Sequence, residues 1–250
     1  MASIPFSHVS VLLNECIESL NIRDGYTYVD CTTGGGGHSL EIAKRLGPNS
    51  KLICFDRDVN AICAAKERLK DYLDKIIFIN SNFSELSNII EQYNITNLGG
   101  VLADLGCSSF QFDCPERGFS YMHDAPLDMR MQIDAPLSAY NVINEYSESE
   151  LKRVIYEYGE ERFAPRIASA ICKARAERAI RTTFELSDII KSAIPAAARA
   201  DGPHPAKRTF QAIRIEVNAE LDTIRPMIMS AAENMNESGR IVIISRSEDA

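Results

Sequence analysis

The chain has 250 residues, of which 45% are apolar and 25% charged, and a formal net charge of −8, all ordinary values for a globular protein. Its apolar runs are far too short to cross a bilayer and its first residues show no signal-peptide pattern, so we expect a cytoplasmic protein and no membrane partner. Its seven scattered cysteines include no C-x-x-C pair, which argues against a disulfide framework, a zinc site or any other metal centre.

Up to Asp104 the chain alternates between helical and strand patterns. The patterns predict helices over residues 8–20, 39–46, 60–73 and 84–93, and strands over 26–30, 51–56, 75–80 and 100–104. Strands separated by helices of this length indicate an α/β, Rossmann-like parallel sheet with right-handed crossovers. Ligands of such sheets bind beyond the carboxyl ends of the strands, so Asp30, Asp56 and Asp104 are expected on one rim.

A glycine-rich loop joins the first predicted strand to the next helix. It contains four consecutive glycines, residues 34–37, which allow positive φ angles and let a ligand approach the backbone. The helix start favours an anionic group of that ligand. Asp56 ends the second strand, where this fold places the acid that binds ribose hydroxyls. The pattern therefore predicts a cofactor that contains adenosine.

The loop also distinguishes between two adenosine cofactors. Ser39 stands where the dinucleotide fingerprint G-x-G-x-x-G/A requires its third small residue. Asp30, directly before the loop, would repel a pyrophosphate but suits the amino group of a methionine moiety. The loop therefore favours S-adenosylmethionine over NAD. An NAD-dependent oxidoreductase is the disfavoured alternative, because no acid–base residue for a hydride site is evident either.

Asp104 begins a segment, Asp104-Leu105-Gly106-Cys107-Ser108-Ser109, at the place where amino-group methyltransferases carry their catalytic loop. A carboxylate that accepts the N–H bonds of a base amine localises the lone pair and orients it towards a sulfonium methyl. Asp104 is predicted either to do this or to bind the cofactor. The Asp/Asn-Pro-Pro-aromatic motif of other amino methyltransferases is missing. Cys107 as a nucleophile is disfavoured, because no local base supports it.

After Asp104 the alternation stops. Residues 110–135 read as a long ordered loop, residues 147–198 as helical, and a helix at 206–221 follows the break Gly202-Pro203-His204-Pro205. A strand returns at 240–245. We therefore expect a cofactor-binding domain made of residues 1–109 and 206–250, with an inserted helical domain at 110–205.

The inserted region differs in charge from the rest of the chain. Residues 151–214 contain 13 Lys or Arg against 7 Asp or Glu, a balance of +6, which leaves 27−13 = 14 basic and 35−7 = 28 acidic residues elsewhere, or −14. Such asymmetry indicates a face that binds a polyanion, although basic helices are often only solvated surfaces.

Several separate motifs now point to one family. They are His8-x-x-Val11-Leu12-Leu13, the loop of residues 30–39, Asp56-Arg57-Asp58, Asp104-Leu105-Gly106-x-Ser108-Ser109, Glu116-Arg117-Gly118-Phe119-Ser120, Pro126-Leu127-Asp128-Met129-Arg130-Met131, Tyr158-Gly159-Glu160-Glu161-Arg162-Phe163 and Arg208-Thr209-Phe210-Gln211-Ala212-Ile213-Arg214. In this order they resemble the RsmH/MraW family of small-subunit ribosomal RNA cytosine-N4 methyltransferases, over roughly residues 6–245.

The resemblance implies S-adenosylmethionine as cofactor and, as methyl acceptor, a decoding-centre cytidine of 16S rRNA within the small ribosomal subunit. The cofactor contacts it implies are Gly36, Gly37, His38, Asp56, Phe83, Asp104 and Gln111. The inserted domain would help to bind RNA, with Arg162, Arg166, Arg208 and Arg214 as candidates for phosphate contacts or, alternatively, for structural ion pairs. An unstacked target base needs an aromatic wall, for which Phe119, Tyr121 and Phe210 are candidates.

One departure from the family concerns the C-terminus. In the family the last parallel strand is followed by Phe-His-Ser-Leu-Glu-Asp and a longer segment, whereas here Ile244-Ser245 leads to Arg246-Ser247-Glu248-Asp249-Ala250. We therefore expect the family's C-terminal strands to be absent and an unpaired edge to favour a homodimer. The alternative function is a non-catalytic RNA-binding or ribosome-assembly protein that keeps the cofactor fold.

Overall fold

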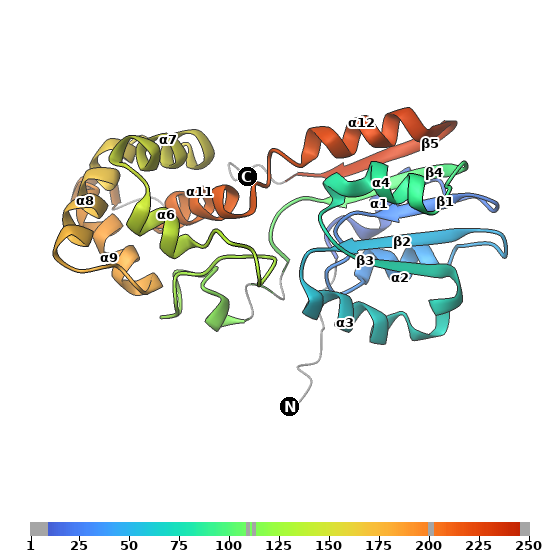
Figure 1. The fold of residues 1–250 in the computed structure, drawn as a ribbon, viewed down its shortest axis with the longest axis horizontal. Coiled ribbons are helices and arrows are strands. Elements are labelled where there is room, and N and C mark those ends of the chain that lie inside the picture. The colour runs from blue at the N-terminus through green and yellow to red at the C-terminus, as the bar shows by residue number, and fades with distance from the viewer. Residues whose placement is uncertain (1–9, 109–110, 112–113, 200–202, 246–250) are drawn as a thin grey trace. The chain divides into compact units, whose positions relative to one another are not determined.

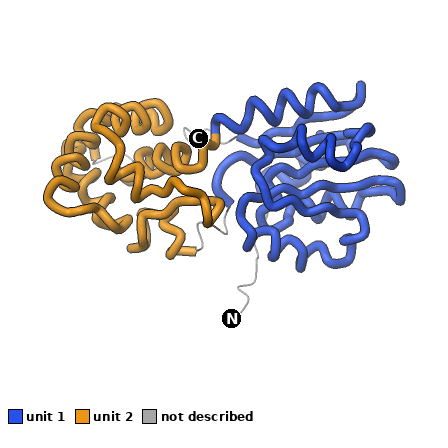
Figure 2. The backbone as a smooth tube through the Cα atoms, viewed as in Figure 1, with its two compact units in different colours: residues 1–110, 221–250 blue, residues 111–220 orange. Residues whose placement is uncertain are grey.

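The computed structural model describes residues 10–108, 111, 114–199 and 203–245. The chain divides into two compact units, residues 1–110 with 221–250 and residues 111–220, which Figure 2 colours separately. The second unit thus extends to Glu220, beyond the boundary expected after residue 205. The expected helix start at His8 and the predicted-loop residue Ser109 lie outside the described residues.

The first unit is built on a parallel sheet of five strands in the order β3-β2-β1-β4-β5 (Figure 1). This arrangement confirms the predicted Rossmann-like α/β class. The strands are β1 (Thr27–Asp30), β2 (Lys51–Asp56), β3 (Ile76–Asn80), β4 (Leu98–Asp104) and β5 (Met235–Ile244). Asp30, Asp56 and Asp104 are the last residues of β1, β2 and β4, so all three lie at the carboxyl edge of the sheet.

Helices cover both faces of this sheet. They are α1 (Leu13–Leu20), α2 (Gly37–Ala43), α3 (Val59–Arg68), α4 (Leu86–Gln92) and α12 (Ile224–Asn234), with short 3₁₀ turns η1 (Lys70–Lys75) and η2 (Phe83–Glu85). Alternate strand residues point to opposite faces: Tyr28 packs with α1, α2 and α3, whereas Val29 packs with α4 and α12. Helix α12 was not predicted, and the helix expected to reach residue 73 ends as an α-helix at Arg68.

The second unit is helical, as the sequence analysis expected for residues 147–198. It contains η3 (Pro115–Arg117), α6 (Ala139–Glu145), α7 (Glu148–Gly159), α8 (Ala164–Glu177), α9 (Thr183–Ala193), α10 (Ala196–Arg199) and α11 (Lys207–Asn218). Capping boxes at Ser138, Ser147 and Thr182 begin α6, α7 and α9. In the part of the chain that the structure describes, no helix is both long and apolar enough to cross a membrane.

Helix α11 belongs to the second unit because it packs against α7. A Cβ on Gly159, at the end of α7, would lie 2.5 Å from the carbonyl oxygen of Arg208 on α11, so only glycine allows this approach. The buried positions of α11 include Phe210 and Ile213, which give the helix an apolar face. That tertiary contact decides the boundary between the units, and it could not be seen in the local pattern.

Candidate active site

The glycine-rich loop after β1 lies at the carboxyl edge of the sheet, where the sequence predicted it. Gly34 and Gly36 adopt the left-handed φ values of 50° and 77°, which suit glycine. The amide of Gly34 donates to the Asp56 carboxylate (N–Oδ2 2.7 Å), and the amide of Gly36 closes a turn onto the carbonyl of Thr33 (2.7 Å). The acid at the end of β2 therefore holds the loop directly.

The start of α2 is covered by the segment that precedes α1. A Cβ on Gly37 would lie 2.0 Å from the Ser10 hydroxyl oxygen, so a larger residue would displace that segment. His38 is buried, and its Nε2 donates to the carbonyl oxygen of Val11 (3.0 Å). Both predicted cofactor residues on this helix, Gly37 and His38, are thus held by residues 10–11.

Asp30 is fully buried at the end of β1. Its Oδ2 accepts from the Ser39 hydroxyl (2.6 Å) and its Oδ1 from the amide of Thr32 (3.1 Å). Burial raises the pKa of the Asp30 carboxyl, although His38 and the Ser39 hydrogen bond oppose that shift. The hydroxyl of Ser39, at the position that departs from the dinucleotide fingerprint, thus anchors the loop to Asp30, and Asp30 acts first as a loop organiser.

Asp56 has the same kind of environment but retains capacity for a ligand. Its Oδ1 accepts from the amide of Asp58 (2.9 Å) and its Oδ2 from that of Gly34 (2.7 Å). Burial raises the pKa of Asp56 to about 6, against the lowering effect of these two bonds. A carboxylate offers about four lone pairs, so ribose hydroxyls can still donate to it.

Phe83 begins η2, which follows the carboxyl end of β3. Its ring is half-buried against the core, and the Arg57 guanidinium lies 5.9 Å from the ring centroid. Arg57 comes directly after Asp56, so the ring stands beside the predicted ribose acid. This placement suits an aromatic that packs on a purine.

Asp104 ends β4 beside the glycine-rich loop. Its amide donates to the Thr32 hydroxyl (2.7 Å), which joins the two strand ends. The backbone then opens at Gly106, where φ is 123° and a Cβ would meet no atom within 4 Å. Gln111, the other predicted cofactor residue, is buried and belongs to the second unit. Within the first unit, the structure brings Gly36, Gly37, His38, Asp56, Phe83 and Asp104 to the same edge of the sheet.

These residues fit S-adenosylmethionine. The Asp56 carboxylate is an acceptor of the kind that ribose hydroxyls need, and Phe83 is an apolar ring of the kind that packs on adenine. A Cβ on Gly34 would find its nearest atoms at 3.7 and 4.0 Å, and one on Gly106 would find none, so the backbone can be approached at both places. The three strand-end acids, Asp30, Asp56 and Asp104, gather negative charge near this edge, which is unfavourable for the pyrophosphate of NAD.

The predicted phosphate-binding arginines differ in their surroundings. Arg162 and Arg166 are exposed near the start of α8, with the Arg162 guanidinium 4.8 Å from the Phe163 ring centroid. Arg208 donates to the carbonyl of Glu160 (3.0 Å), which places it beside the same helix start. Arg214 instead pairs with Glu220 at 2.8 Å and is mostly buried, the arrangement of a structural ion pair.

The three candidates for an aromatic wall also separate. Phe119 and Phe210 are buried, and the Tyr121 ring meets Phe210 edge-on with centroids 5.6 Å apart. Tyr121 also stacks on His204, at 4.3 Å and an angle of 6° between the planes. His204 was seen in the sequence only as part of a helix break, because a contact across so many residues leaves no local signal.

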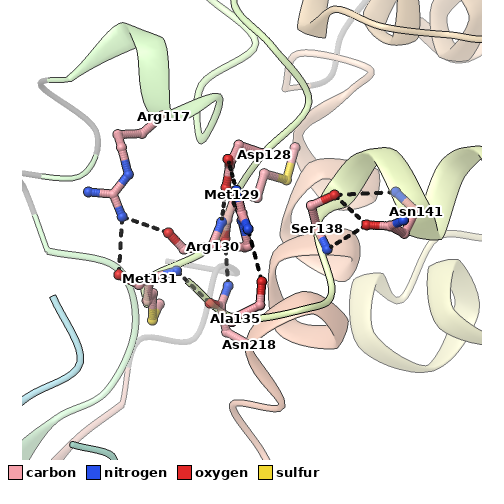
Figure 3. A network of polar contacts seen from close by, with 9 residues as sticks. All are labelled: Arg117, Asp128, Met129, Arg130, Met131, Ala135, Ser138, Asn141 and Asn218. Atoms are coloured by element: carbon pink, nitrogen blue, oxygen red, sulfur yellow. Dashed lines mark hydrogen bonds and ion pairs between the residues drawn. The ribbon is translucent and has the colours of Figure 1, made fainter. Parts of the chain in front are cut away.

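The loop of residues 126–131 was part of the family resemblance, and its side chains form a polar network inside the second unit (Figure 3). Asp128 pairs with Arg130 at 2.7 Å. Asn218 accepts from the amide of Met131 (2.7 Å) and donates to the carbonyl of Met129 (2.8 Å). Met129 itself is fully buried with a left-handed φ of 57°. The network holds this strained turn in place.

Comparisons with known proteins point to one family. The model of the MraW methylase family matches residues 5–248. A protein of Clostridioides difficile called "Ribosomal RNA small subunit methyltransferase H" is 57% identical over 240 residues, 96% of this chain and 77% of that relative. Relatives of the same name from Finegoldia magna (54% over 241 residues; 96% and 77%) and Brevibacillus brevis (51% over 245 residues; 98% and 78%) are similar.

Proposed function

This chain belongs to the MraW methylase family, and from that membership we propose that it methylates the N4 amine of a decoding-centre cytidine in 16S rRNA. The observation that supports the proposal most directly is the acid-lined sheet edge, where Asp56 and Asp104 flank the glycine-rich loop. The relatives are named for the small ribosomal subunit, which supports that particle as the partner.

S-adenosylmethionine is the cofactor, and when bound it supplies an electrophilic methyl group on its sulfonium. Asp56 accepts hydrogen bonds from the ribose, Phe83 packs on the adenine, and the backbone of the glycine-rich loop faces the methionine portion. These residues fix the cofactor before the acceptor base arrives, so much of the entropic cost of alignment is met by the fold.

Asp104 performs the orienting step for the acceptor. The lone pair of a cytosine amine is delocalised into the ring, so the amine is a poor nucleophile. A carboxylate oxygen that accepts one amine N–H localises that lone pair and points it at the methyl group. The amine nitrogen would take up the methyl group that the bound cofactor supplies, leaving S-adenosylhomocysteine, and its proton would pass to the Asp104 carboxylate that accepts the N–H bond.

The RNA contacts belong to the helical unit. Arg162, Arg166 and Arg208 form a basic cluster at the α7–α8 junction that binds backbone phosphates. The +6 balance of residues 151–214 supports this assignment. Because the reaction acts on a bacterial ribosomal particle, we place the protein in the cytoplasm.

The test is nucleoside mass spectrometry of 16S rRNA from cells with and without the gene. We expect the N4-methylcytidine signal at one position to disappear in the deletion strain and to return when this chain is expressed. An unchanged nucleoside profile would reject the assignment. Purified chain, small subunits from the deletion strain and labelled S-adenosylmethionine should reproduce the transfer in vitro.

The role of Asp104 is tested by Asp104→Asn and Asp104→Ala. If it orients the amine, Asp104→Ala loses methyl transfer and Asp104→Asn, which keeps an acceptor oxygen, loses less, while calorimetric affinity for S-adenosylmethionine is retained in both. If it binds the cofactor instead, affinity falls together with activity. A non-catalytic assembly protein is not favoured, because the glycine loop and all three strand-end acids are in place. Pairing of a second copy along β5 stays a prediction.

A further inference from the structure

An aromatic stack on the second unit is not used by the function proposed above. It joins Tyr121, which follows the buried Phe119, to His204, which precedes α11. The rings are parallel within 6° and their centroids are 4.3 Å apart, the geometry of a stack. Phe210 meets the Tyr121 ring edge-on and is buried, so it fixes that ring from inside.

The outer member of the stack faces solvent. His204 is exposed, whereas Tyr121 is half-buried. Its Nδ1 accepts from the amide of Ala206 (3.2 Å), which fixes the ring and leaves Nε2 as the protonated nitrogen of the neutral form. The prolines on both sides, Pro203 and Pro205, restrict the backbone that carries it. An exposed aromatic face is thus held rigid at little further entropic cost.

The surroundings suit a nucleobase that carries phosphates. Lys191 on α9 is close enough for its positive charge to act on His204, and it is exposed. Partial desolvation against Tyr121 and this charge hold the pKa of His204 below its ordinary value, which favours the neutral ring. A neutral flat ring beside an ammonium group is the arrangement that single-stranded nucleic acid binders use for base stacking and backbone attraction.

We propose that the exposed face of His204, backed by Tyr121, stacks on one unpaired base of the RNA that this protein methylates. The inference rests on the proposed function and adds a second contact to the arginine cluster. It assigns to His204 a positioning role, since the ring would place the RNA strand without touching the reacting amine. The competing explanation is that the stack only anchors the turn before α11.

Two variants separate these explanations. His204→Asn removes the ring but keeps an acceptor for the Ala206 amide, whereas His204→Phe keeps the ring and loses that acceptor. Tyr156→Ala is the matched control, because Tyr156 is an exposed aromatic of the same unit, on α7. The probe is a short single-stranded oligoribonucleotide of 16S sequence in which one base is 2-aminopurine, whose fluorescence is quenched on stacking.

If His204 stacks on the RNA, the wild-type protein should quench the probe for at least one position of 2-aminopurine. His204→Asn should weaken binding about tenfold or more and abolish the quenching. His204→Phe should bind within about threefold of wild type, since any aromatic ring offers a π-face. The slope of log affinity against log salt should not change, because no charge is removed. Tyr156→Ala should bind as wild type does.

The proposal is overturned if His204→Asn binds and quenches like wild type, or if His204→Phe is as weak as His204→Asn. A His204→Asn variant that binds like wild type beside a weak His204→Phe would identify the Ala206 hydrogen bond, and hence the turn, as the important feature. Circular dichroism melting checks that each variant folds. A wild-type protein that methylates small subunits but never quenches the probe refutes only the stack. A wild-type protein that binds S-adenosylmethionine but neither binds nor methylates RNA refutes the proposed function and the stack together.

Discussion

In the sheet unit, Asp30 and Asp56 accept hydrogen bonds from backbone amides and a hydroxyl, and burial raises the pKa of both carboxyls. In the helical unit, Asp128 has a pKa below its ordinary value. Burial opposes this shift, but the hydrogen bonds and charge of Arg130 outweigh the effect of burial. The sheet unit therefore keeps acidic acceptors for a hydroxyl-bearing, cationic ligand. The helical unit pairs Asp128 with Arg130 and leaves Arg162 and Arg166 exposed.

The largest expected effect is a loss of stability in the helical unit when the neutral side chain of Asn218 is removed. Asn218→Ala removes three hydrogen bonds, to Met129, Met131 and Arg214, and leaves buried backbone groups without a partner. We expect the free energy of unfolding to fall by about 3 kcal/mol, measured by urea denaturation.

Asn234→Ala is the control for this loss. Asn234 donates one side-chain bond, to the Ser230 carbonyl (2.8 Å) on the surface helix α12, so its loss should cost at most about 1 kcal/mol. Hydrogen exchange should show the lost protection of Asn218→Ala in residues 126–131. Equal losses in the two variants would mean that the network of Figure 3 adds nothing beyond single bonds.

The next effect concerns the acceptor at the end of β2. Asp56→Ala should lower affinity for S-adenosylmethionine by about 1–3 kcal/mol, or roughly tenfold to hundredfold, because charged hydrogen bonds to the ribose are lost. Isothermal titration calorimetry measures this directly. Asp71→Ala, at an exposed acid of η1, should bind as wild type does. Unchanged affinity of Asp56→Ala would remove Asp56 from the cofactor site.

The helical counterpart is a double variant, Arg162→Ala with Arg166→Ala. Loss of two phosphate contacts should weaken RNA binding about tenfold at moderate salt and reduce the slope of log affinity against log salt by about 1.5. Cofactor affinity should be spared. Arg214→Gln, which breaks the pair with Glu220, should lower stability and leave the salt slope unchanged. If only Arg214→Gln changed the salt slope, Arg214 would be the phosphate contact, and Arg162 and Arg166 would not be.

The smallest effect is a pH dependence in the sheet unit. The pKa of Asp56 is about 6 in the folded chain and about 3.9 when unfolded, so folding favours its protonated form and stability falls as pH rises between these values. Ribose hydroxyls prefer the ionised form, so affinity for S-adenosylmethionine should rise up to about tenfold from roughly pH 5 to pH 7. Asp56→Asn should remove this rise. If wild type and Asp56→Asn had parallel pH profiles of affinity, the rise would belong to another titrating group.

Much of the sheet unit could be predicted because its signals are local. Strand β2 was expected at residues 51–56 and is found there, and the acids at the strand ends follow from the pattern of a parallel sheet. The long helix expected over residues 60–73 was wrong beyond Arg68, where the chain tightens into η1. Helix α12 was missed because Pro226 and the polar residues around it weaken its periodic pattern.

The helical unit was harder to predict because its important contacts join distant residues. Asn218 meets Met129 and Met131 only after the fold has formed, and nothing near Asn218 in the sequence indicates this. Arg214 resembles Arg162 in the sequence, but a pair with Glu220 distinguishes it. The same holds for His204, which is defined by its contact with Tyr121. The chemical type of each side chain could be read from the sequence, whereas its contact partners in the fold could not.

The cover that Ser10 and Val11 place over α2 has a practical consequence for anyone who handles this protein. Because the Ser10 hydroxyl occupies the space beside Gly37 and Val11 holds the ring of His38, a purification tag fused close to these residues would pull on the glycine-rich loop. Recombinant versions should carry their tag behind a long flexible spacer, and a tag after β5 is no better, because Ile244 pairs with Asp104 at the edge of the site. Weak cofactor affinity in a tightly fused version would reflect the fusion and not the enzyme.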